Sequence, residues 1–172
     1  MTMQTLRLPS TMIATALVLA MSVGFAGSDG ARDQKVTVAK AFADSFAAND
    51  LDHWFSLLAD GFTAVYTPTG AAVLDKEQAR DLNQAFIAAF PDMRMQVERV
   101  LVDGDFVALY LNATATHTGP LLLGGETISP TGQPVVGSLV YTAEIRDGKI
   151  VREWTHWDQW ALLTQLGLMA IE

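Results

Sequence analysis

Two stretches in the first half of the chain carry apolar residues at three- and four-residue spacing, the period of an amphipathic helix. The first lies within residues 33–49, and its repeating apolar positions are Ala39, Phe42, Ala43 and Phe46. The second follows Asp75, which has Gln78 three residues later as in a capping box, and its stripe is formed by Ala79, Leu82, Phe86 and Phe90. Both stretches predict helices, and a shorter helix is expected over residues 50–59.

From residue 93 onward the pattern changes to alternation of apolar and polar residues, which is typical of strands. The expected strands, after a short one at 62–66, cover residues 93–97, 106–116, 135–145 and 150–157. The Asp147-Gly148 pair predicts a hairpin turn, residues 119–132 a loop, and residues 160–168 a final helix. Helices followed by an antiparallel meander predict an α+β fold, a cone in which amino-terminal helices pack on a curved antiparallel sheet. The mouth of such a cone is the expected ligand site.

Composition narrows the class of protein. The chain has 172 residues, half of them hydrophobic, which suits one domain with a sizeable core. Its formal net charge is −8, so a nucleic-acid partner is not expected, because phosphate contacts need clustered Lys and Arg. The chain has no cysteine, which excludes disulfides, thiol catalysis and thiolate metal sites.

The first 26 residues resemble a secretory signal peptide. Arg7 supplies a positive charge, residues 12–23 form an uncharged and largely apolar run, and Gly24-Phe25-Ala26 places small residues at a cleavage site. The run is shorter than a membrane-spanning helix requires, so no stable membrane anchor is expected after cleavage. We therefore expect export to the periplasm or the medium, with residues 27–31 as a short flexible lead and one domain over 33–168. The alternative is an uncleaved helix of a cytoplasmic protein.

The last predicted strand carries the most informative residues. Side chains alternate along a strand, so Trp154, His156 and Asp158 share one face. The other face carries Glu153, Thr155 and Trp157. If the first set faces the cone, Asp158 is a carboxylate among bulky rings, and burial there would raise its pKa toward that of a general acid or base. Asp158 also precedes the final helix, and the spacing alone favours an N-cap.

Several short motifs occur together along the chain and carry a family resemblance. They are Ala89-Phe90-Pro91-Asp92-Met93, Val102-Asp103-Gly104-Asp105, Thr116-His117-Thr118-Gly119, Pro130-Thr131-Gly132, Asp147 to Val151, and Trp154 with Asp158 and Gln165-Leu166-Gly167. In this order they resemble the SnoaL-like polyketide cyclase (ester cyclase) family. The resemblance implies a nuclear transport factor-like cone. It also implies a cofactor-free intramolecular aldol ring closure, in which an Asp at the Asp158 position moves the proton.

Other polar residues complete the candidate site. His117 is the candidate donor to an enolate oxygen, with a structural loop histidine as the alternative. Trp154, His156, Tyr141 and Asn112 are candidates for substrate binding, although an exposed or a core position would also suit Tyr141 and Asn112. We expect no metal and no cofactor; the alternative is a two-histidine, one-carboxylate site made from His117, His156 and Asp158.

Three functions follow as hypotheses. The first is a cofactor-independent cyclase-type enzyme, of a lyase or isomerase kind, that acts on an apolar carbonyl compound with Asp158 as its general acid/base. The second is a carrier that binds an apolar small molecule without chemistry. The third is an assembly module of the same fold. A homodimer is expected under all three, because an exposed apolar sheet face is costly in water.

Overall fold

The computed structural model describes the backbone of residues 11–67, 72–123 and 125–169, and side chains from Asp29 onward. Internal contacts divide the chain into two units, residues 1–34 and residues 35–172. Helix α1 (Thr11–Ala47) runs through the expected lead at residues 27–31, so the prediction of a flexible segment there is wrong. No helix in the part of the chain that the structure describes is long and apolar enough to cross a membrane.

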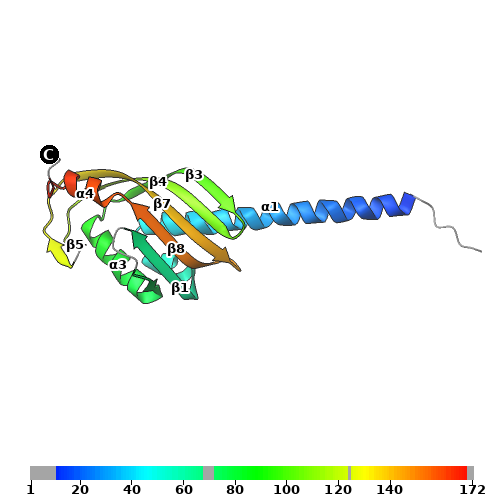
Figure 1. The fold of residues 1–172 in the computed structure, drawn as a ribbon, viewed down its shortest axis with the longest axis horizontal. Coiled ribbons are helices and arrows are strands. Elements are labelled where there is room, and N and C mark those ends of the chain that lie inside the picture. The colour runs from blue at the N-terminus through cyan, green and yellow to red at the C-terminus, as the bar shows by residue number, and fades with distance from the viewer. Residues whose placement is uncertain (1–10, 68–71, 124, 170–172) are drawn as a thin grey trace, which may run out of the picture. The chain divides into compact units, whose positions relative to one another are not determined.

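A six-stranded sheet in the order β2-β1-β8-β7-β4-β3 forms the body of the second unit (Figure 1). Its strands are β1 (Leu58–Thr67), β2 (Leu74–Asp75), β3 (Arg94–Asp103), β4 (Phe106–Thr116), β7 (Pro134–Arg146) and β8 (Lys149–Trp157). The β1–β8 pair is parallel, which corrects the expectation of a wholly antiparallel sheet. Within the described residues the sheet ends at β2 and β3 without closing, so the fold is an open α+β cone.

The Asp147-Gly148 pair makes the tight turn that the sequence predicted. Asp147 has φ of 50° and Gly148 has φ of 73°, the left-handed conformation that a two-residue hairpin between twisted strands requires. The turn joins β7 to β8 in antiparallel register. As a result β8 lies inside the sheet, paired with β7 on one side and β1 on the other.

Helices cover one face of the sheet (Figure 1). The Lys35–Ala47 part of α1, α2 (Leu51–Ser56) and α3 (Lys76–Ala89) contribute Phe42, Trp54 and Ala79 to the main core. The predicted capping box at the start of α3 is present, since Asp75 accepts a hydrogen bond from the Gln78 backbone N–H and the Gln78 side chain accepts one from the Asp75 N–H. These helices leave the interior of the cone lined by both helix and sheet side chains.

A second, smaller core lies at the end of the cone that carries α4 (Gln159–Gln165). The 119–132 segment, expected to be all loop, contains a two-stranded hairpin of β5 (Leu121–Leu123) and β6 (Glu126–Ile128). Leu121 is almost fully buried there and packs in one cluster with Phe90 and Leu162. Burial of Leu121 against α3 and α4 residues explains why this turn-rich segment forms strands.

The segment that leads into this hairpin crosses the end of α3 at close range. The backbone N–H groups of Thr118 and Gly119 both donate to the Ala89 carbonyl oxygen at 3.1 Å. A Cβ on Gly119 would lie 1.9 Å from the Ala88 carbonyl oxygen, a backbone atom that cannot rotate away. Glycine is therefore required at position 119 by the approach of two backbones.

Gly119→Ala should lower the free energy of unfolding by about 2 kcal/mol or more, because the added methyl group forces the two backbones apart. Gly61→Ala is the matched control, since a Cβ there meets nothing within 4 Å. Denaturant unfolding of the two variants checks the prediction. Equal stability of both variants would contradict the close approach.

Candidate active site in the interior of the cone

The direction of side chains on β8 decides which residues face the interior. Glu153 is 2% exposed and lines the interior with Thr155 and Trp157, whereas Trp154 and His156 lie on the outer face. Trp154 and His156 therefore do not face the cone, and they are not placed to bind a ligand inside it.

A β-bulge causes this reversal. Ile150 pairs with Ile145, but the next paired residue on β8 is Arg152, so Val151 is an extra residue in the strand. One extra residue shifts the alternation, because side chains on a strand have a period of two. Ile150 is in the core, and strict alternation from it would have put Trp154 inside; the bulge puts Glu153 there instead.

The interior holds a cavity of about 430 Å³, a size typical of small-molecule sites. Its wall is mainly apolar and is built from both helices and strands. The principal apolar side chains are Phe42, Phe46, Trp54, Leu82, Phe86, Phe90, Met93, Met95, Leu111, Leu139, Trp157 and Leu162. Such a lining suits an apolar ligand, and the ligand itself stays a prediction.

Polar side chains from three elements meet on one part of this wall. Asn83 of α3 donates to the Tyr66 hydroxyl at 3.2 Å, and that hydroxyl lies 3.5 Å from Glu153 Oε2, to which it donates. Thr155 Oγ1 donates to Glu153 Oε1 at 2.9 Å. In the strand register Glu153 lies between Ala64 and Ala143, and these small neighbours leave room for its carboxyl group.

Burial changes the acid–base properties of this group. Removal from water raises the pKa of the Glu153 carboxyl from 4.5 to about 8, and the hydrogen bonds from Thr155 and Tyr66 only partly offset this effect. Glu153 is therefore mostly uncharged near neutral pH. Burial, followed by the nearby Glu153 carboxyl, also raises the pKa of Tyr66 well above the usual tyrosine value. No sequence motif singled out Glu153, Tyr66, Asn83 or Thr155, although strand alternation placed Glu153 and Thr155 on one face.

Tyr141, one of the candidate binding residues, lies on the wall of the interior cavity. It is 2% exposed, lines the cavity, and is held by its ring, which stacks on Phe42 with 4.5 Å between centroids. Its hydroxyl oxygen is buried and has no hydrogen-bond partner among the described residues. Burial raises the pKa of Tyr141 well above the usual value, so the hydroxyl keeps its proton.

Asp158 occupies the rim between the interior and the outer face. Its Oδ1 accepts a hydrogen bond of 2.9 Å from the Ala161 backbone N–H, so it is the N-cap of α4 that the spacing favoured. The residue is exposed, yet it lines both the interior cavity and a groove on the outer face. A role in proton transfer stays a prediction.

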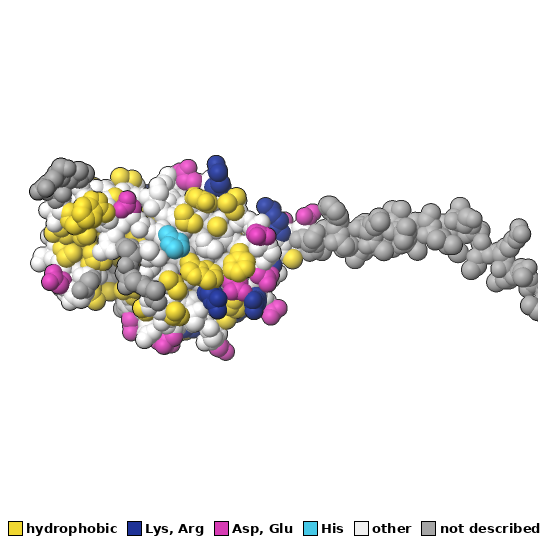
Figure 2. Space-filling view, viewed as in Figure 1, with side chains coloured by type: hydrophobic (Ala, Val, Ile, Leu, Met, Phe, Trp, Pro, Cys, Tyr) yellow, Lys and Arg dark blue, Asp and Glu magenta, His cyan; other side chains and the backbone are white. Residues whose placement is uncertain are grey.

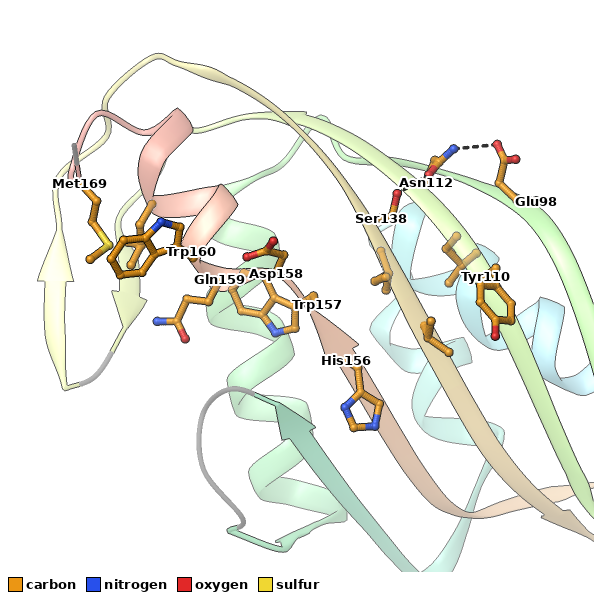
Figure 3. A pocket seen from close by; sticks show the side chains of 14 residues that line it. Glu98, Tyr110, Asn112, Ser138, His156, Trp157, Asp158, Gln159, Trp160 and Met169 are labelled. Atoms are coloured by element: carbon orange, nitrogen blue, oxygen red, sulfur yellow. Dashed lines mark hydrogen bonds between the residues drawn. The ribbon is translucent and has the colours of Figure 1, made fainter. Parts of the chain in front are cut away.

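The outer groove has a volume of about 910 Å³, and two of the other candidate residues, Asn112 and His156, line it (Figure 3). Asn112 donates to Glu98 at 2.7 Å and accepts from Ser138 at 2.8 Å, and His156 lies farther along the same face. On the face in view in Figure 2, hydrophobic side chains gather most densely toward the end that carries α4. Asn112 and His156 thus belong to the outside of the sheet and lie apart from the cavity.

His117 and Trp154 line neither space. His117 is fully buried, its Nδ1 accepts from the Thr131 backbone N–H at 3.2 Å, and its ring packs on Phe90. Burial lowers the pKa of His117, and a backbone interaction with Gly119 opposes that shift. This geometry fits the structural alternative for His117, whereas Trp154 packs on Phe106 of the outer face. Among the residues that the structure describes, no three His, Asp or Glu side chains are grouped to hold a metal ion.

The curved, mostly antiparallel sheet and the helices that cover it define a nuclear transport factor-like cone. The chain belongs to the SnoaL-like polyketide cyclase family, whose family model matches residues 36–166. Among curated proteins, none matches the chain in sequence.

Solved structures with this fold include proteins named for two kinds of reaction. A protein from Jannaschia sp. CCS1, provisionally described as a SnoaL-like polyketide cyclase, is 25% identical, with a TM-score of 0.71 over 81% of this chain and 95% of its own. IdmH from Streptomyces antibioticus, provisionally a polyketide cyclase, is 28% identical, with a TM-score of 0.67 over 78% of this chain and 99% of its own. AclR from Streptomyces galilaeus, provisionally a hydroxylase, is 24% identical, with a TM-score of 0.71 over 81% of this chain and 89% of its own, and it supports the fold alone.

Glu153→Gln should stabilise the protein at high pH and have less effect at low pH. The folded-state pKa of about 8 exceeds the ordinary value of 4.5, so the stability of the wild type falls as pH rises between these values and levels off above about 8. We expect the variant to gain about 2 kcal/mol or more over the wild type between pH 5 and pH 9. Thermal unfolding at both pH values measures it, with Glu98→Gln on the outer face as control. A gain that does not depend on pH would contradict the raised pKa.

Proposed function

We propose that this protein is a cofactor-independent enzyme of the cyclase type, which closes a ring in an apolar carbonyl compound held in the interior cavity. The observation that carries the proposal is a ligand-sized apolar cavity with a carboxyl group, Asp158, on its rim. Family membership supports the same reaction class. Proton removal next to a carbonyl, and its return, are steps that a positioned carboxylate can perform.

Asp158 would act in two steps. Its carboxylate takes a proton from the carbon next to a substrate carbonyl and leaves an enolate. The enolate carbon then attacks a second carbonyl carbon, so that a carbon–carbon bond forms, and the new alkoxide takes the proton back from Asp158. One Asp158 oxygen accepts the Ala161 N–H in the cap, which orients the carboxylate and leaves its second oxygen to exchange the proton.

The cap complicates a simple alanine test, and a pair of variants separates the two roles. Asp158→Asn keeps an N-cap side chain but cannot take a proton, whereas Asp158→Ala loses both functions. We expect Asn to leave the free energy of unfolding nearly unchanged and Ala to lower it by about 1 kcal/mol. Both should reduce proton abstraction about a hundredfold or more.

Deuterium exchange provides the assay without knowledge of the substrate. The probe is 5α-androstane-3,17-dione, a rigid apolar compound with a ketone at each end, incubated with the protein in heavy water. Mass spectrometry then follows deuterium uptake next to the ketones. Full exchange activity in Asp158→Asn would contradict the acid/base role, and a wild type that binds the probe without accelerating exchange would favour the carrier alternative.

We further propose that residues 1–26 direct export and are removed. The support is the charged start, the apolar run and the small residues before position 27. Intact mass spectrometry of the protein from its own host should then give a chain that begins at Gly27. A full-length mass with the first residues present would contradict cleavage.

A further inference from the structure

The interior cavity contains polar groups that the proposed role of Asp158 does not use. Glu153 and Asp158 lie five residues apart on one extended segment, which corresponds to about 16 Å between their Cα atoms at the usual rise of a strand. The two carboxyl groups therefore cannot act on the same ligand atom. Glu153 and Tyr141 must serve another part of the ligand, or have no role in binding.

The Tyr141 hydroxyl is the first sign of a binding site. A buried hydroxyl without a partner is unfavourable, and native proteins rarely keep one. Phenylalanine would preserve the stacking of the ring on Phe42 and avoid this loss. The side chain lines the cavity, so a ligand oxygen is an acceptor that could satisfy it.

Glu153 offers a second donor beside it. Tyr141 pairs with Thr155 across β7 and β8, and Thr155 in turn donates to Glu153 Oε1, so the groups are neighbours on one face. Tyr66 donates to the other carboxyl oxygen. When Glu153 is uncharged, its own proton needs an acceptor, and a carboxylic acid kept neutral by an apolar site can donate a hydrogen bond.

We propose that Tyr141 and Glu153 form a binding subsite for a carbonyl oxygen at the inner end of the ligand, to which both donate hydrogen bonds. The subsite anchors the end of the ligand that lies away from Asp158. Asn83 and Tyr66 hold Glu153 in place from α3 and β1 and act as positioning residues. The inference rests on the proposed function only in placing an apolar carbonyl compound in the cavity.

The subsite should respond to pH through one group. The titratable side chains that face Glu153 are Tyr66 from β1 and Tyr141 from β7, whereas α1 and α3 contribute the neutral Phe42 and Asn83. Both tyrosines keep their protons well beyond neutrality, so ionisation of Glu153 above pH about 8 is the event that removes a donor. Affinity for a ligand with an inner oxygen should fall there.

Binding of two matched compounds tests the proposal. We would compare 5α-androstane-3,17-dione with 5α-androstane, the same ring system without any oxygen, by quenching of tryptophan fluorescence. The wild type should bind the dione about tenfold more tightly than the hydrocarbon, the value of one or two net hydrogen bonds. Tyr141→Phe should abolish most of this preference and raise the thermal stability of the empty protein, a combination that a purely structural tyrosine would not give.

Two further variants sharpen the outcome. Glu153→Gln keeps an N–H donor and cannot ionise, so it should retain the preference at pH 9, where the wild type loses it. Tyr110→Phe, an exposed tyrosine on the outer face, should change nothing. Equal affinity of the wild type for the two compounds, no binding of either, or a preference unchanged in Tyr141→Phe would each overturn the subsite.

The outcomes of this binding test can be told apart from the outcomes of the Asp158 exchange test. Loss of the acid/base proposal would show as unaltered deuterium exchange in Asp158→Asn, and the preference for the dione would remain. Failure of the subsite would remove that preference and leave the effect of Asp158 on exchange intact.

Discussion

The register of β8 is the constraint on which the interior depends. The strand pairs with β1 in parallel and with β7 in antiparallel fashion, so it cannot slip by one residue without breaking two ladders of hydrogen bonds. The bulge at Val151 then selects which alternate side chains point inward. Glu153 reaches a cavity wall beside two alanines because of that single extra residue. A strict strand would have put Arg152 and Trp154 on the interior side.

Several of the family motifs act together as a clasp at the α4 end of the cone, outside the polar part of the cavity. Asp92 accepts hydrogen bonds from the Thr116 backbone N–H and hydroxyl, both at 2.7 Å, and these bonds lower its pKa. The Gln165 side chain bonds both backbone groups of Val136. With the contact of His117 and Thr131, these pairs join segments far apart in sequence. These motif residues therefore hold the architecture together, whereas Asp158, which belongs to another motif, lines the cavity.

Two polar residues of the interior lower the stability of the fold, although they suit the binding of a ligand. A core built for stability alone would use Phe at position 141 and an apolar residue at 153, since the unpaired hydroxyl and the buried carboxyl both oppose folding. The surrounding aromatic packing is extensive, and the clasp and the two-sided pairing of β8 hold these groups in place. Positions where a sequence departs from the rules of a good core are where binding sites are expected.

The sequence by itself determined the elements with strong local signals: the Asp75 capping box, the Asp147-Gly148 turn, the strand at 106–116, the α+β class and the family. It also offered Tyr141 as a strand residue that could reach a ligand, and it favoured Asp158 as a cap, because the position before the final helix follows from local spacing. It did not find the hairpin at 121–128 or the parallel β1–β8 pair, which depend on packing between distant segments. Only the tertiary structure decided that Glu153 faces inward and His156 outward, because a one-residue bulge leaves no clear trace in the hydrophobic pattern and yet reverses every later side chain.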